Sequence, residues 1–178
     1  SAPVEAETST SEAEAESTPG TKPVVMPIDD VELLLEQAHS RDSVLELSLF
    51  FAAGLSDQAA VFMLPRGNAV GRFLHGEETL QAVFRAFSIP IDSDTIFVKI
   101  RDSLVPYSGP IPSTKADRIF FALFDPPPQQ VYFFPVRIRG RNIATLYCHQ
   151  YHEDLPAEIY EQFMRCVHLA AHALERVV

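Results

Sequence analysis

The spacing of apolar residues predicts helices at both ends of the chain. In the first predicted helix, apolar side chains share one face at helical spacing: Val31, Leu34, Leu35 and Ala38. Ser43 followed by Glu46 fits a capping box, so we expect a second helix to begin near Ser43 and to stop at Gly54. The same period returns after Asp154 and predicts a closing helix over residues 155–177.

Two stretches between these helices have the pattern of β-hairpins. In residues 59–76, two runs rich in Val, Phe and Leu flank the turn residues Pro65–Asn68. In residues 131–150, VYFFPVRIRGRNIATLYCHQ, two apolar runs flank Gly140 and its neighbouring arginines. We therefore expect an antiparallel sheet with helices packed against it, which is an α+β fold.

The segment between the hairpins, residues 77–130, gives mixed signals. Residues 77–91 predict a short helix that leads into a short strand, and residues 93–103 predict another helix. The three prolines of PYSGPIPS disfavour regular structure, so this stretch is expected to be a loop. Asp117 is expected to cap a short helix that ends at Asp125 and the three prolines after it.

Residues 1–28 differ from the rest of the chain in composition. They hold five glutamates, one lysine and no aromatic residue, and Ser, Thr, Ala and Pro fill most of the other positions. Such a segment has little to bury that would offset its ordering entropy, so we expect a disordered acidic linker. Residues 29–178 then form one domain of ordinary size.

Charge and cysteine use narrow the classes of function. The net charge of −10 opposes binding to a phosphate backbone, so no nucleic-acid partner is expected. No apolar run approaches the ~20 residues that a membrane span needs, so no membrane partner is expected either. Cys148 and Cys166 lack the spacing of a zinc site and are expected to be buried, reduced thiols, which suits a cytoplasmic location.

The second hairpin carries a family resemblance. Phe134–Val136, Gly140–Arg141 and Ile143–Tyr147 together resemble the strand–turn–strand order of GAF domains, a family of small sensory domains, although Ala144 replaces the usual glycine. The resemblance implies a GAF-like (profilin-like) antiparallel sheet of five or six strands with the terminal helices packed on one face. It also implies a place in a signalling protein, frequent dimerisation through the terminal helices and no chemistry of its own. PAS domains and other profilin-like folds share the coarse order of elements.

In GAF domains the variable middle segment often encloses a small-molecule pocket. Neither Asn68 nor Asn142 begins the asparagine–lysine motif of GAF domains that bind cyclic nucleotides. Cys148 and His149 match the cysteine–histidine pair of bilin-binding GAF domains by adjacency alone, so we expect no cofactor. Six aromatic residues are nevertheless candidates to line an apolar pocket, the alternative being a plain core: Phe62, Phe73, Phe97, Tyr107, Phe120 and Phe134.

The closing helix carries two apolar rows side by side, which is wider than one contact with a sheet needs. We predict a homodimer that uses this helix and residues 31–52. The alternative is a helix wedged between the sheet and the first helices. The candidate interface row contains Ile159, Phe163, Cys166, Ala170, Ala173 and Val177.

Metal and catalytic chemistry have weaker candidates. His168 and His172 are four residues apart on the closing helix, but they belong to a polar stripe that needs no metal, so no metal site is expected. The sequence contains no nucleophile elbow and no phosphate-binding loop. A hydrolase that used Ser108 or Ser113 would require a histidine within hydrogen-bond reach.

The turn RIRGR holds three arginines around one glycine. Arg137 and Arg141 match the RxxxR motif of PilZ domains, but the downstream motif of that family is missing. We expect Arg137 and Arg139 to point to solvent from the same face of a strand, with Gly140 supplying the positive φ of a tight turn. The alternative is that Arg137, Arg139 and Arg141 bind an anionic partner.

The sequence therefore predicts a non-enzymatic, GAF-like regulatory domain of a larger, bacterial-type signalling protein in the cytoplasm. It would act by dimerisation or by docking to another signalling protein. The first alternative is a small-ligand sensor with a pocket under residues 92–128. The second is the hydrolase.

Overall fold

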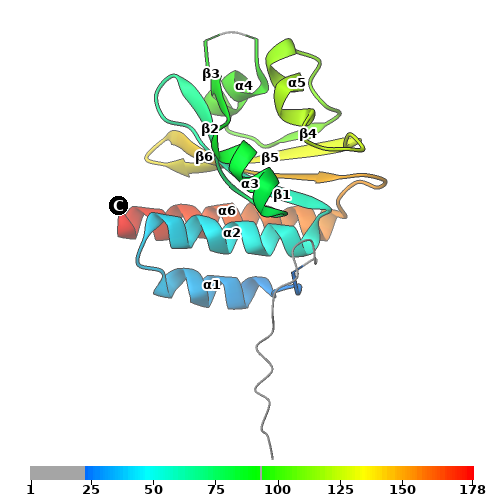
Figure 1. The fold of residues 1–178 in the computed structure, drawn as a ribbon. Helices are drawn as coiled ribbons and strands as arrows, with labels where there is room; N and C mark the ends of the chain where they lie inside the picture. The colour runs from blue at the N-terminus through cyan, green and yellow to red at the C-terminus, as the bar shows by residue number, and fades with distance from the viewer. Residues whose placement is uncertain (1–22, 93) are drawn as a thin grey trace, which may run out of the picture.

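The computed structural model describes residues 23–92 and 94–178 of the 178-residue chain. Its centre is a six-stranded antiparallel sheet in the order β3-β2-β1-β6-β5-β4 (Figure 1). The strands are β1 (Gln58–Met63), β2 (Asn68–Leu74), β3 (Ser88–Pro90), β4 (Tyr107–Gly109), β5 (Gln130–Ile138) and β6 (Arg141–Gln150). The helices are α1 (Ile28–Gln37), α2 (Arg41–Leu55), α3 (Glu78–Arg85), α4 (Ile96–Asp102), α5 (Lys115–Phe121) and α6 (Ala157–Val177). The predicted α+β fold is confirmed.

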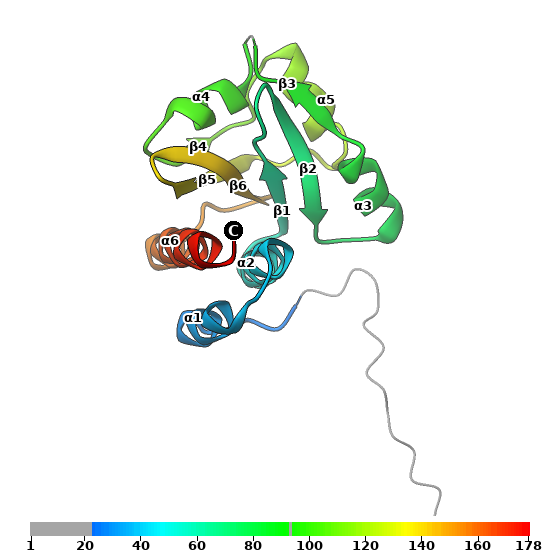
Figure 2. The same cartoon turned by 90° about the vertical axis from the view of Figure 1, so that its left-hand side faces the viewer.

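The two faces of the sheet are covered differently. α2 and α6 lie directly on one face, and α1 packs across them as an outer layer (Figure 2). Buried side chains such as Phe51, Phe134 and Phe163 form the core on this side. α3, α4 and α5 cover the opposite face, where a second core is built around Phe62 and Phe120. The terminal helices therefore share one face, as expected.

Two helices begin elsewhere than the capping signals predicted. Ser40 caps α2, because its hydroxyl accepts a hydrogen bond from the Ser43 N–H at 3.1 Å, and the helix continues past Gly54. Thr114 caps α5, because its Oγ1 accepts the Asp117 N–H at 3.2 Å. Asp117 is thus in the first turn of α5 and is free to bond elsewhere.

The β5–β6 hairpin ends in a two-residue turn. Arg139 has a φ of 48° and Gly140 a φ of 77°, which is the left-handed backbone of a type I′ turn. The positive φ of Gly140 was predicted. Arg139 belongs to the turn and not to the strand, so the prediction that it shares a strand face with Arg137 is wrong.

β4 lies in the stretch that was predicted to be a loop. Residues 107–109 pair antiparallel with residues 131–133 at the edge of the sheet. Pro106 and Pro110 lie just outside the three paired residues, so they remove no hydrogen-bond donor from the ladder. A short edge strand flanked by prolines also offers little backbone for pairing with another chain.

Residues 23–28, the end of the predicted linker, lie against the domain. Met26 and Ile28 pack on the helical core, and residues 23–25 pass close to Gly54 near the end of α2. The rest of the predicted linker, residues 1–22, is outside the described residues. Among the helices of the described residues, none is long and apolar enough to cross a membrane.

Candidate functional site

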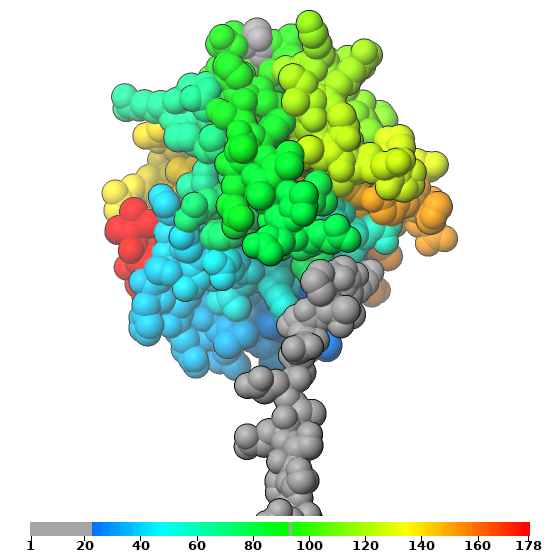
Figure 3. All heavy atoms as spheres, in the orientation of Figure 1, coloured from blue at the N-terminus to red at the C-terminus, as the bar shows by residue number. Residues whose placement is uncertain are grey.

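Aromatic side chains fill the space between the sheet and the helices of the middle segment. The Phe62 ring of β1 lies at the centre, with its centroid 4.8 Å from that of Phe97 and 4.9 Å from that of Phe120. We call this group the ring cluster; its members, each at most 1% exposed, are Phe62, Phe84, Phe97, Phe120, Phe133 and Tyr147. The green and yellow-green atoms of the middle segment make up the upper part of the molecule, above the blue and cyan terminal helices (Figure 3). Aromatic pairs at such distances add stability beyond the apolar area that they bury.

The structure separates the six predicted pocket residues. Phe62, Phe97 and Phe120 come together in the ring cluster. Phe134 lies on the opposite face and stacks on the Phe163 ring of α6, with centroids 5.1 Å apart and planes at 15°. The remaining two are likewise outside the cluster: Phe73 packs on the helical core and Tyr107 lies at the edge of the sheet.

Three members of the ring cluster were missed by the sequence prediction, namely Phe84, Phe133 and Tyr147. The sequence did indicate the position of Phe133, because Phe133 and Phe134 are neighbours on a strand and must point to opposite faces of the sheet. The register of the second hairpin pairs Phe133 with Tyr147, so both belong on the same side of the sheet.

A cavity of about 500 Å³ lies beside the ring cluster, at the starts of α4 and α5. We call it the Asp117 cavity. Asp117 is 1% exposed, and its Oδ2 accepts hydrogen bonds from the Ile96 N–H at 2.9 Å and the Thr114 hydroxyl at 2.6 Å. Its Oδ1 and the Thr95 Oγ1 are buried without a hydrogen-bond partner among the described residues. Tyr107 also lines this cavity.

Burial controls the electrostatics of the Asp117 cavity. Burial raises the pKa of Asp117, and the hydrogen bonds from Thr114 and Ile96 partly oppose that rise. The pKa of Tyr107 is raised by its own burial and then by the Asp117 charge. The unused oxygens of Asp117 and Thr95 could accept hydrogen bonds from a ligand that carries N–H or O–H groups.

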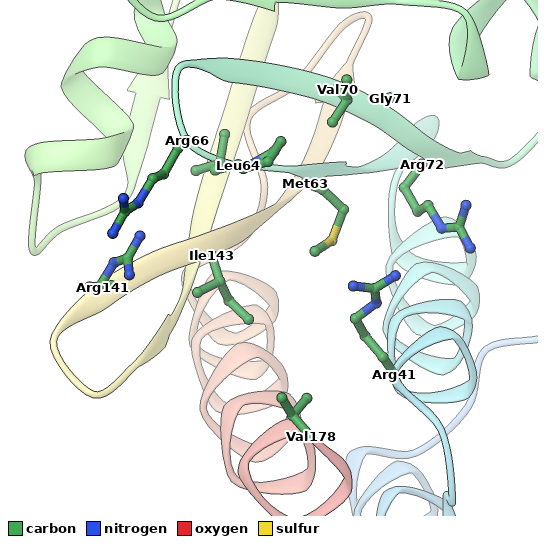
Figure 4. A pocket seen from close by; sticks show the side chains of 11 residues that line it. Arg41, Met63, Leu64, Arg66, Val70, Gly71, Arg72, Arg141, Ile143 and Val178 are labelled. Carbon is green, nitrogen blue, oxygen red and sulfur yellow. The ribbon is translucent and has the colours of Figure 1, made fainter.

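A larger cavity, of about 600 Å³, opens on the helical side of the sheet (Figure 4). It lies between the turn that joins β1 to β2, the start of β6, the start of α2 and the end of α6. We call it the arginine groove; it is lined by Arg41, Met63, Leu64, Pro65, Arg66, Val70, Gly71, Arg72, Arg141, Ile143 and Val178. Its lining combines an apolar floor with four arginines, which are the only ionisable side chains that line it among the described residues.

The four arginines are arranged as two pairs. Arg41 and Arg72 lie near the start of α2, where Asp42 accepts hydrogen bonds from the Arg72 guanidinium and lies 3.9 Å from Arg41 Nε. Arg66 and Arg141 lie beside each other at the other end, with Met63 and Ile143 between the two pairs (Figure 4). Within the described residues, neither Arg66 nor Arg141 has a carboxylate within 4 Å.

The predicted dimer row of α6 is occupied by contacts within the domain. Phe163, Cys166, Ala170 and Ala173 are at most 2% exposed. They belong to the helical core, while Ile159 and Val177 at the two ends of the row are partly buried against it. α6 is thus wedged between the sheet and the first helices, because its wide apolar surface covers β5 on one side and α1 and α2 on the other.

Two polar side chains of the second hairpin are buried on the ring-cluster side of the sheet: Tyr147, a member of the cluster, and His149. The Tyr147 hydroxyl and His149 Nδ1 are 2.6 Å apart and hydrogen-bonded, while Nε2 has no partner among the described residues. Burial lowers the pKa of His149 to about 4, so the ring is neutral near pH 7. Burial also raises the pKa of the Cys148 thiol, which makes this cysteine a poor site for attaching a chromophore.

The other candidate residues lie apart from these cavities. Ser108 is exposed on β4, and Ser113 is exposed in the loop before α5; no hydrogen bond joins either to a histidine within the described residues. His168 and His172 are exposed on α6 with their Nε2 atoms 3.2 Å apart, and no group of three metal-ligating side chains is present in the part that the structure describes.

The RIRGR arginines have different surroundings. Arg137 donates a hydrogen bond to the Gly140 carbonyl at 3.0 Å, and Arg139 is exposed in the turn. Arg141 alone of the three lines the arginine groove. The second hairpin therefore contributes one arginine, at the start of β6, to a site whose other arginines come from distant parts of the chain.

Comparison with known proteins identifies the fold. No family model and no curated protein sequence matches the chain. The GAF domain of a phosphoenolpyruvate-protein phosphotransferase from Coxiella burnetii is 18% identical, with a TM-score of 0.65 over 84% of this chain and 89% of that one. The GAF domain/HD domain protein from Geobacter sulfurreducens is 14% identical, with a TM-score of 0.65 over 80% and 97%. Residues 122 to 287 of a methyl-accepting chemotaxis protein are 15% identical, with a TM-score of 0.63 over 84% and 96%. The chain therefore has the GAF fold, which confirms the resemblance seen in its second hairpin.

Proposed function

We propose that this domain is a non-enzymatic regulatory module of a cytoplasmic signalling protein and acts by dimerisation or by docking to a partner. The observation that carries the proposal is the ring cluster, because the space over this face of the sheet is filled by side chains of the domain itself. The likeness to GAF domains of a phosphotransferase and to a chemotaxis protein supports a role in signalling.

The exposed surfaces of α1 and α2 supply the contact in this proposal. Leu33 of α1 is 57% exposed, and Leu34 of α1 and Phe50 of α2 are also exposed. Since α1 packs against α2, these side chains belong to neighbouring helices. Because the row of α6 is covered within the domain, we place the proposed dimer contact on the outer surface of α1 and α2, where apolar side chains are exposed to a second chain.

Light scattering across a range of protein concentrations tests this contact. The wild-type chain is expected to approach the mass of two chains, and a Leu33→Glu/Leu34→Glu variant is expected to keep the mass of one. Ile119→Glu is a matched control, because Ile119 is 62% exposed on α5, on the other side of the sheet. A wild-type chain that has the mass of one chain at every concentration would remove dimerisation from the proposal.

A small-ligand sensor is the second candidate function, and the Asp117 cavity favours it. Asp117 Oδ1 and Thr95 Oγ1, which have no partner in the part of the chain that the structure describes, are acceptors that a ligand with N–H or O–H groups would satisfy. A screen of small amines and alcohols by thermal unfolding tests it. A ligand of this cavity should stabilise the wild-type chain but not Asp117→Asn, while Arg66→Gln, which alters the arginine groove, should respond like the wild type. If no compound separates these variants, the sensor hypothesis fails.

A further inference from the structure

In the arginine groove, two positively charged side chains, Arg66 and Arg141, lie beside each other, and an anion bound there would be stabilised by both. β1 and β6 pair antiparallel up to Met63 and Ala144, and the Leu64 N–H then donates to the Ile143 carbonyl at 2.8 Å. Continuing this register brings Arg66 opposite Arg141, which agrees with their positions in Figure 4. Like charges at opposite positions of adjacent strands are destabilising. A negatively charged occupant between the two guanidinium groups would remove that cost.

The arginines favour an anionic occupant, and the apolar floor of the groove adds a second requirement on the occupant. Met63, Ile143 and Val178 lie between the two arginine pairs (Figure 4). A volume of about 600 Å³ is enough for a short stretch of polypeptide or a small molecule. The occupant that fits this lining is anionic but also carries small apolar groups.

The charge distribution of the chain points to an occupant within the same molecule. Residues 23–178 contain 13 Lys and Arg against 19 Asp and Glu, so the net charge of the domain repels an acidic segment. The groove reverses that balance locally, because it has four arginines and, among the described residues, only Arg41 and Arg72 have a carboxylate, that of Asp42, within 4 Å. Residues 1–22 carry five glutamates and one lysine, and residues 12–16 read EAEAE. In an extended segment, alternate side chains point to opposite sides, so three carboxylates and two methyl groups would separate onto two faces.

We propose that residues 1–22 bind in the arginine groove of their own chain, with Glu12, Glu14 and Glu16 facing the arginines and Ala13 and Ala15 facing the apolar floor. This intrachain contact goes beyond the proposed dimerisation and does not depend on it.

The chain is long enough to make this contact. Residues 23–25 pass Gly54 near the end of α2, whereas Arg41 begins that helix. The 15 residues of α2 cover about 22 Å at the helical rise. The seven residues from Glu16 to Pro23 can span about 23 Å, and the eleven from Glu12 about 36 Å. A segment tethered this closely has an effective concentration on the order of millimolar, so modest affinity is enough for occupancy.

Paramagnetic broadening of methionine methyl signals in the full chain tests the proposal. A spin label is attached at Ser11→Cys; Cys148 and Cys166 are buried with raised thiol pKa and should stay unlabelled. The chain has three methionines, so ¹³C-methyl labelling gives three signals. Met63 lines the groove and should lose its signal. Met164 lies 14 residues before Val178 on α6, about 21 Å along the helix, and should keep its signal.

Charge variants separate the groove from the rest of the surface. Glu12→Gln/Glu14→Gln/Glu16→Gln should restore the Met63 signal, and so should Arg66→Gln/Arg141→Gln. The matched control is Arg137→Gln/Arg139→Gln, which also removes two positive charges but takes them from positions of the β5–β6 hairpin outside the groove, and it should leave the broadening in place. Salt at 1 M should also restore the signal, because the Debye length then falls to about 3 Å.

Four outcomes of these experiments would overturn the proposal. An unbroadened Met63 signal in the labelled wild-type background would show that the segment is not in the groove. The same conclusion would follow if the control pair restored the signal as fully as the groove pair. Broadening seen only when spin-labelled chains are mixed with ¹³C-labelled chains would assign the segment to the groove of another copy. A Met63 shift on adding inorganic phosphate, without broadening by the label, would assign the groove to a free anion.

Discussion

The two faces of the sheet are built from the same strands but are closed in different ways. Phe133 and Phe134 are neighbours on β5, yet one joins the ring cluster and the other stacks on α6. The ring-cluster face is covered by α3, α4 and α5, none longer than 8 residues, whereas α2 and α6 of the helical face have 15 and 21. Helices as short as the first group are unstable in isolation. We therefore expect packing of the rings to hold the middle segment on the sheet. The helices of the other face keep exposed apolar surface that a second chain could contact.

The largest expected effect comes from emptying the centre of the ring cluster. Phe62→Ala should lower the free energy of unfolding by about 3–5 kcal/mol, because Phe62 contacts rings from several elements and is fully buried. Phe73→Ala on the helical face should cost less, since Phe73 is only partly buried. Urea denaturation measures both. Equal losses would contradict the view that the rings of one face hold the middle segment.

The buried His149 should make stability depend on pH. Its pKa is lowered from 6.5 to about 4 by burial, so folding favours the neutral ring. The contribution of the neutral His149 ring to the free energy of unfolding is fully present above pH 6.5. It is lost as the pH falls toward 4, because the unfolded chain then binds a proton at this histidine and the folded chain does not. A shift of this size corresponds to at most about 3 kcal/mol.

Unfolding free energies measured across this pH range check the prediction. His149→Gln should flatten the fall in stability between pH 6.5 and 4. His39→Gln, which changes an exposed histidine, should leave the fall unchanged. A fall that is the same in all three chains would place its cause outside the ring-cluster face.

The smallest expected effect is at the turn that joins β5 to β6. Arg139 has a positive φ, which a side chain other than Asn, Asp or Gly adopts at a cost. Arg139→Asn should therefore raise the free energy of unfolding by about 1 kcal/mol, since Asn-Gly suits a type I′ turn. Thermal unfolding against Arg137→Asn, on the strand beside the turn, checks this. If both variants were more stable than the wild type, the cause would be the loss of a positive charge and not the backbone conformation of the turn.

Much of the fold could be predicted from the sequence, because hydrophobic period and turn residues are local signals. Gly140 marked the second hairpin, and the long period after Asp154 marked α6. β4 could not be found in this way, because three residues between prolines show no period. Ser40 was overlooked as a cap because the capping box at Ser43 and Glu46 offered a competing signal.

The candidate sites were harder to predict, because they depend on register and on contacts between distant segments. β1 and β2 pair Val61 with Phe73, so Phe73 faces the helices with Val61, while the neighbouring Phe62 belongs to the ring cluster on the other face. The arginine groove collects side chains from α2, β2, β6 and the turn after β1. No local motif joins these segments, and of its four arginines the sequence had singled out only Arg141.

Mass spectrometry of the gently purified chain after denaturation tests most directly whether the ring-cluster face is closed by the protein itself. The account predicts that the chain is released without a stoichiometric small molecule. One small molecule per chain, reduced in Asp117→Asn but retained in Arg66→Gln, would contradict it and would make the Asp117 cavity the functional site.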